Sequence, residues 1–107
     1  MVFAAEIINL VKSLKEKRES IISNQIGRSG TSIGANIFEA QYAHGRADFI
    51  AKLQIALKEA NETGCWLELL YRTMYITENE YQNLNAACTS IRVMRISSIN
   101  TAKEKTQ

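Results

Sequence analysis

Residues that interrupt helices are scarce in this chain, whose 107 residues include no proline and only five glycines. A β-sandwich of this size needs many tight turns, and such turns are rich in these two residues. The sequence therefore favours helices. Its length leaves room for one domain with one hydrophobic core. An apolar fraction of 46% and a charged fraction of 22% are typical of a folded globular protein.

Apolar residues recur three and four positions apart in four segments, which is the period of an amphipathic helix. The predicted helices cover residues 3–17, 21–43, 46–75 and 77–102. Their boundary signals are Ser20 as an N-cap, Gly45 as a left-handed residue after a helix end, and a capping box from Thr77 to Glu80. Short connections between long helices predict an all-α fold, an antiparallel up-down-up-down four-helix bundle that forms a single domain over residues 1–107.

The second predicted helix contains Gly27, Gly30 and Gly34, all on the side that carries Ile33 and Ile37. Each glycine costs about 1 kcal/mol relative to alanine within a helix. Close approach of another helix along this groove of small residues would offset the cost. Access for a fatty acid or a cofactor is the alternative, and no other feature of the sequence supports it.

The two later helices each have an apolar face of the kind that packs in bundles. In helix 46–75 this face comprises Phe49, Leu53, Ala56, Leu57, Ala60, Gly64, Leu67, Tyr71 and Met74. In helix 77–102 it comprises Leu84, Ala87, Cys88, Ile91, Met94 and Ser98, with Arg95 at its edge and Val93 and Ile96 facing away.

The back of helix 46–75 is not purely polar, because Ile55, Trp66 and Leu69 project there beside Glu59 and Glu62. A surface helix of a monomer rarely exposes such apolar side chains together. We therefore expect this face to contact another subunit. The two glutamates are either solvated or meet a basic residue of a neighbouring subunit.

Nothing in the sequence assembles into an active site. The single histidine, His44, lies at a helix end, and no Glu-x-x-His motif of a di-iron bundle occurs. We therefore expect no enzymatic activity, no metal and no cofactor. Cys65 and Cys88 lack CxxC spacing and are predicted to be reduced core residues. The N-terminus lacks the basic region of a signal peptide, and the longest charge-free run is too short to span a bilayer. These features predict a cytoplasmic protein.

The formal net charge of +2 permits nucleic-acid binding without predicting it. Basic residues form two groups, which are Lys12, Lys15, Lys17 and Arg18 in the first helix and Arg92, Arg95, Lys103 and Lys105 in the last. Both groups are explained as solvated charges. In a ring of identical subunits, however, each group is repeated and would contact several phosphates at once.

Two segments carry a resemblance to a known family. Residues 28–40 contain the pattern R-S-x-T-S-I-x-x-N-I-x-E-A, and residues 48–57 contain D-F-I-x-x-L-x-I-A-L. The likeness continues through residues 62–67 and covers essentially the whole chain. The sequence resembles the bacterial four helix bundle protein family, also called 23S rRNA-intervening-sequence or S23-type proteins, because some members are encoded inside insertions in ribosomal RNA genes.

The resemblance implies a left-handed bundle that assembles into a ring, typically a pentamer, without enzymatic activity. Relatives that accompany diversity-generating retroelements are strongly basic and bind nucleic acid and a reverse transcriptase, whereas this chain is nearly neutral. The resemblance also suggests roles for four residues. Gly30 and Gly34 allow close helix contact, Asn36 forms a buried hydrogen bond that fixes helix register, and Glu39 is available to a neighbouring subunit.

These observations lead to one functional hypothesis and one alternative. The hypothesis is a non-catalytic homo-oligomer, a pentameric ring, that acts as an adaptor or accessory factor. Its expected interface comprises Ile55, Trp66, Leu69, Glu39, Glu59 and Glu62, and its expected weak contacts with RNA or DNA comprise Lys12, Lys15, Arg92 and Arg95. The alternative is a structural or protein-partner module that binds no nucleic acid.

Overall fold

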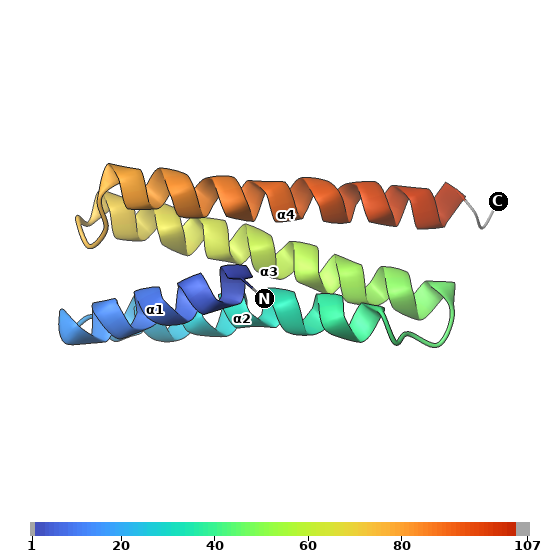
Figure 1. The fold of residues 1–107 in the computed structure, drawn as a ribbon, viewed down its shortest axis with the longest axis horizontal. Coiled ribbons are helices and arrows are strands. Elements are labelled where there is room, and N and C mark those ends of the chain that lie inside the picture. The colour runs from blue at the N-terminus through green and yellow to red at the C-terminus, as the bar shows by residue number, and fades with distance from the viewer. Residues whose placement is uncertain (1, 105–107) are drawn as a thin grey trace.

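A computed structural model of the chain describes residues 2–104 and contains four α-helices. They are α1 (Val2–Glu16), α2 (Ile21–Ala40), α3 (Arg46–Arg72) and α4 (Glu78–Glu104). The chain reverses direction at each connection and forms a rod 50 Å long (Figure 1). α2 and α3 form the central pair, α1 packs on α2, and α4 packs on α3. The predicted all-α bundle is confirmed, while its left-handed sense stays a prediction.

At the junction between α1 and α2, a side-chain carboxylate caps the start of α2. Glu19 is buried, and its two carboxylate oxygens accept hydrogen bonds from the backbone N–H groups of Ile22 at 2.8 Å and Ser23 at 2.7 Å. These N–H groups lie in the first turn of α2 and have no partner within the helix. Ser20, the predicted N-cap, makes no side-chain capping bond. Ser20 does occupy the predicted N-cap position, but Glu19, one residue earlier, supplies the capping hydrogen bonds in its place.

The other two connections contain the expected signals at slightly different positions. Gly45 has a positive φ of 99° and is the N-cap residue of α3. It does not terminate α2, because α2 ends earlier than predicted, at Ala40. α3 ends at Arg72, before the predicted residue 75. The capping box at the start of α4 is present. Thr77 and Glu80 exchange side-chain to backbone hydrogen bonds of 3.0 and 3.1 Å.

The main core lies under α1, where side chains of all four helices meet. Its fully buried members include Ile7 and Leu14 of α1, Ile26 of α2, and Leu67 and Leu70 of α3. α2 and α3 are joined within this region by a buried pair of hydroxyl groups, because Ser29 Oγ and Thr63 Oγ1 lie 2.8 Å apart. A buried hydroxyl needs such a partner, so this pair restricts how the two helices align.

Four residues assigned to the core are exposed instead, and one of them is Tyr71, at 36%. Met94 is 56% exposed, and Met74 is 88% exposed because it lies in the connection after α3, where its φ is 68°. Cys65 is also exposed, whereas Cys88 is buried and its thiol lies 3.1 Å from the carbonyl oxygen of Ala60. Burial raises the pKa of the Cys88 thiol above its usual value.

Arg95 occupies the inner face of α4 that was expected to hold Met94. It lies seven residues from both Cys88 and Ala102, which are buried, and two full turns return a side chain to the same face. Arg95 is itself half-buried, and its Nε atom has no hydrogen-bond partner within residues 2–104. Its long aliphatic stem can line an inner face where a short polar side chain would not.

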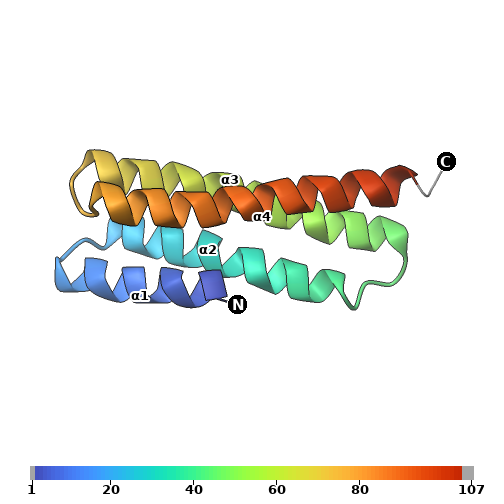
Figure 2. The same ribbon diagram turned by 45° about the horizontal axis from the view of Figure 1, so that its top comes forward.

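The bundle is not covered evenly along its length. α1 has 15 residues and α4 has 27, and the N-terminal end of α1 lies near the middle of the rod (Figure 1 and Figure 2). Beyond this point α2, α3 and α4 enclose a second, smaller cluster of Ala40, Leu53 and Ile99, with Phe49 only partly buried. Within residues 2–104, three helices rather than four enclose this half.

Candidate interaction surface

The outer side of the α2–α3 pair carries an ion-pair network. The Arg28 guanidinium of α2 donates to a carboxylate oxygen of Glu59 at 3.1 Å and also to Glu62, both on α3. Trp66 extends the network, because its indole Nε1 lies 3.4 Å from the same Glu62 oxygen. The basic partner of the glutamate pair is therefore a residue of the same chain, and the pair is neither simply solvated nor left free for a neighbouring subunit.

Apolar side chains flank this network along α3. Ile55 is 41% exposed and Leu69 is 39% exposed, while Trp66 is half-buried and packs against the main core. Ile55 and Leu69 are fourteen residues apart and Glu62 is midway, so all three lie on one face of the helix. We call the surface formed by Arg28, Ile55, Glu59, Glu62, Trp66 and Leu69 the α2–α3 face.

Glu39 was expected to be free for a neighbouring subunit, but it already has a partner. Its carboxylate lies 3.1 Å from the Lys52 ammonium of α3. The carboxylate is 56% exposed, and exposed ion pairs contribute at most about 1 kcal/mol. Glu39 can therefore exchange Lys52 for a basic residue of another subunit at little cost in stability. It is nevertheless not an unpaired charge.

The basic residues predicted to contact nucleic acid do not form one patch. Lys12 and Lys15 are exposed on α1. Arg92 lies on α4 and donates to Asn61 of α3 at 3.3 Å and to Thr89 at 3.1 Å. Arg95, also on α4, is half-buried. Lys12 and Lys15 lie on α1, whereas Arg92 is bonded to α3, a helix that makes no close contact with α1.

The residues predicted to set helix packing behave differently from one another. At Gly30, an added Cβ would lie 2.8 Å from a methyl carbon of Ile7, so α1 packs against bare backbone there. At Gly34, one turn later, nothing lies within 4 Å, so the close contact expected at that position is not made. Gly30 lies beneath α1, and Gly34 does not.

Asn36, predicted to form a buried hydrogen bond that fixes helix register, makes only part-buried bonds within its own helix. Its side-chain amide donates to the Ser32 carbonyl at 2.9 Å and to the Ser32 hydroxyl at 3.1 Å, both within α2. The buried polar contact between helices is the Ser29–Thr63 pair. A signal for it was present, because both residues are small and polar at positions of an otherwise apolar face.

Chemically reactive groups are sparse in the described part of the chain. Residues 2–104 contain no group of three potential metal ligands among His, Cys, Asp and Glu. His44 lies in the exposed connection between α2 and α3. No helix among these residues is long and apolar enough to cross a membrane.

Comparison with known proteins agrees with this architecture. A family model described as 23S rRNA-intervening sequence protein matches residues 1–97. The chain belongs to this family. A crystal structure of an S23 ribosomal protein family member of unknown function from Bacteroides thetaiotaomicron VPI-5482 is 59% identical in sequence. The match covers 91% of each chain with a TM-score of 0.89. A search of curated proteins gave no match.

Membership in the 23S rRNA-intervening sequence protein family agrees with the observed fold but does not specify an activity. The matched region includes α1, α2 and α3 entirely and most of α4. Every residue of the α2–α3 face therefore lies within the part of the chain that the family shares.

Proposed function

We propose that this protein is a non-catalytic homo-oligomer, a ring of five subunits, that acts as an adaptor or accessory factor. The observation that carries the proposal is the α2–α3 face, where exposed apolar side chains surround an already paired set of charges. Ile55 and Leu69 gain from burial at about 25 cal/mol per Å² of apolar surface. Paired charges are far less costly to bury than single ones. This combination is what a subunit interface needs.

The test replaces apolar residues of the α2–α3 face by charged ones and measures subunit number by analytical ultracentrifugation. Trp66→Glu is the strongest perturbation, but Trp66 also packs against the core. Ile55→Glu is therefore the more selective variant, since Ile55 is 41% exposed. Ile96→Glu is its matched control on the outside of α4, where Ile96 is 46% exposed.

The expected result is a smaller species for Ile55→Glu and unchanged assembly for Ile96→Glu, both with native helix content. If both variants assemble as the parent protein does, the α2–α3 face is not the interface. If the parent protein is itself a monomer across the accessible concentration range, the oligomeric part of the proposal is wrong.

Weak binding of RNA or DNA is the second part of the proposal, and the spread of the cations argues for low affinity. Lys12 and Lys15 project from α1, while Arg92 is already bonded to neutral acceptors. Labelled structured RNA and duplex DNA titrated across a salt series provide the test. Binding that weakens steeply with salt indicates phosphate contacts. Absence of binding at low salt favours the alternative, a structural or protein-partner module.

A further inference from the structure

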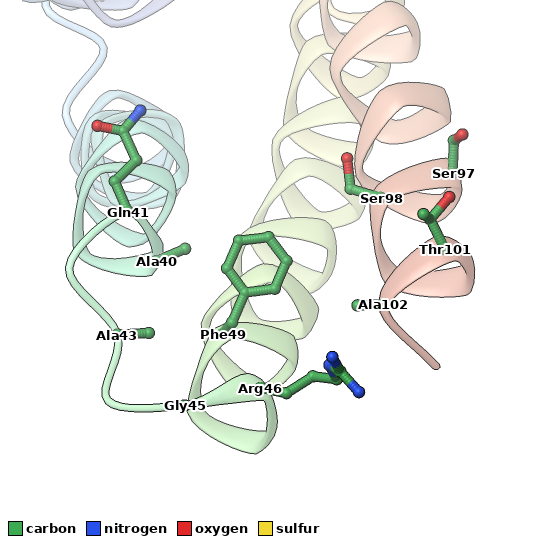
Figure 3. A pocket seen from close by; sticks show the side chains of 10 residues that line it. All are labelled: Ala40, Gln41, Ala43, Gly45, Arg46, Phe49, Ser97, Ser98, Thr101 and Ala102. Carbon is green, nitrogen blue, oxygen red and sulfur yellow. The ribbon is translucent and has the colours of Figure 1, made fainter. Parts of the chain in front are cut away.

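Beyond the N-terminal end of α1, a groove opens between the C-terminal halves of α2 and α4. Its volume is about 740 Å³, and no residue of α1 lines it. Phe49 of α3 projects into the space between α2 and α4, with Ala40 on one side and Ala102 on the other (Figure 3). Gln41, Ser98 and Arg46 lie around this apolar floor. The groove thus has an apolar base and a polar rim.

The groove lies between α2 and α4, the two helices that α1 contacts in the other half of the bundle. α4 has 27 residues and α1 has 15, so α4 continues for about three turns, or ~18 Å, past the end of α1. On the covered half, the same side of the bundle is filled by an amphipathic helix, α1, whose apolar residues are buried against α2. The shape left beyond α1 therefore fits a helix of about three turns.

The charge of the groove is positive and uncompensated. Arg46 lines it. Arg95 is not a lining residue, but it precedes the lining residue Ser98 by one turn of α4. Within residues 2–104, neither arginine has an ion-pair partner, and no aspartate or glutamate lines the groove. Arg95 is half-buried and its Nε atom makes no hydrogen bond. A partly buried guanidinium without a carboxylate is unfavourable, so a ligand that brings one would be stabilised.

We propose that this groove binds an amphipathic helix of a partner protein that carries acidic side chains beside its apolar face. The apolar floor and the helix-sized gap favour a protein helix over RNA, which would need several cations spaced along a backbone. Apolar residues of the partner pack on Phe49, and its carboxylates pair with Arg46 and Arg95. The proposal is independent of self-assembly through the α2–α3 face.

The probe is a four-turn alanine-based peptide with leucines spaced three and four apart and glutamates flanking them. Its control has lysine in place of every glutamate. Fluorescence anisotropy measures binding of each labelled peptide to the full-length protein, and amide chemical shifts of Ala40, Ser98 and Thr101 locate the site. The acidic peptide is expected to bind in the groove, at least about tenfold more tightly than the lysine peptide.

Charge reversal in the protein then tests the groove directly. Arg46→Glu should remove the preference for the acidic peptide or reverse it, because Arg46 is exposed and its replacement leaves the core intact. Lys58→Glu makes the same change of net charge on an exposed residue of α3 outside the groove and should have no effect. Thr101→Trp should block binding by filling the groove.

Three outcomes overturn the proposal. The first is absence of binding by either peptide at millimolar concentration, or equal binding of both. The second is a preference that Arg46→Glu and Thr101→Trp leave unchanged. The third is an occupant of another kind: structured RNA that shifts the same amides more strongly, or peptide binding that dissociates an oligomer of the protein, which would show that a second copy occupies the groove.

Discussion

The half of the bundle beneath α1 and the half beyond it share three helices but differ in closure. Beneath α1, Ile7, Leu14 and Ile26 are completely buried, and a hydroxyl pair joins α2 to α3. Beyond α1, the smaller cluster of Ala40, Leu53 and Ile99 leaves Phe49 partly exposed. One half has a core enclosed by four helices, and the other has a smaller apolar cluster enclosed by three. This difference predicts that stability depends mainly on the covered half, while the proposed partner groove lies in the open half.

The comparison is tested most strongly by shortening one isoleucine in each half. Ile7→Ala should destabilise the protein by about 2–5 kcal/mol, because its cavity is enclosed on all sides. Ile99→Ala should cost less, near the lower end of that range, because the open half can collapse around the gap. Urea denaturation followed by circular dichroism measures both. Equal losses would show that the two halves are equally tightly packed.

The buried hydroxyl pair should show an asymmetry that follows from its other bonds. Thr63 Oγ1 also donates to the Glu59 carbonyl at 2.8 Å, whereas Ser29 has no second partner within residues 2–104. Thr63→Val therefore leaves a buried hydroxyl unsatisfied and should cost about 1–3 kcal/mol, while Ser29→Ala should cost about 1 kcal/mol. A double-mutant cycle measured in urea gives the coupling. Equal costs would contradict the asymmetry, and absence of coupling would contradict a direct bond between these side chains.

Helix positions and exposed faces were predictable because they depend on spacing along one segment. The four apolar patterns located α1 to α4, Thr77 and Glu80 marked the start of α4, and the exposure of Ile55 and Leu69 was expected from their position opposite the apolar face. Each of these features is determined by residues within a few turns of one another.

Contacts between helices were much less predictable. Arg28 and Glu59 are 31 residues apart, and their pairing depends on how α2 and α3 align lengthwise. The same alignment brings Ser29 to Thr63 and leaves Asn36 bonded within its own helix. Apolar periodicity says which side of a helix faces inward but not which residue it meets. The groove beyond α1 likewise depends on the relative lengths of helices that are far apart in sequence.

The two glycines at the boundary between the halves should respond oppositely to alanine. A Cβ at Gly30 would lie 2.8 Å from a methyl carbon of the completely buried Ile7, so Gly30→Ala should cost about 1–3 kcal/mol. Gly34 is open, so Gly34→Ala should stabilise the protein by about 0.5–1 kcal/mol through its higher helix propensity. Thermal unfolding measures both. A loss at Gly34 accompanied by smaller assemblies would place a neighbouring subunit there.

The smallest expected effect concerns Arg28, which lies next to Ser29 but faces outward. Its side chain is 51% exposed, so Arg28→Gln should cost at most about 1 kcal/mol in a monomer, and less at high salt. Glu59 is only 13% exposed and would lose its partner, which places the expected loss near that upper limit.

Urea denaturation at low and high salt measures the effect, with Arg72→Gln as an exposed control from another ion pair. A loss of about 3 kcal/mol or more that persists at high salt would mean that the network is desolvated. Within a single subunit it is open to water, so such a loss would identify the α2–α3 face as a surface that assembly buries.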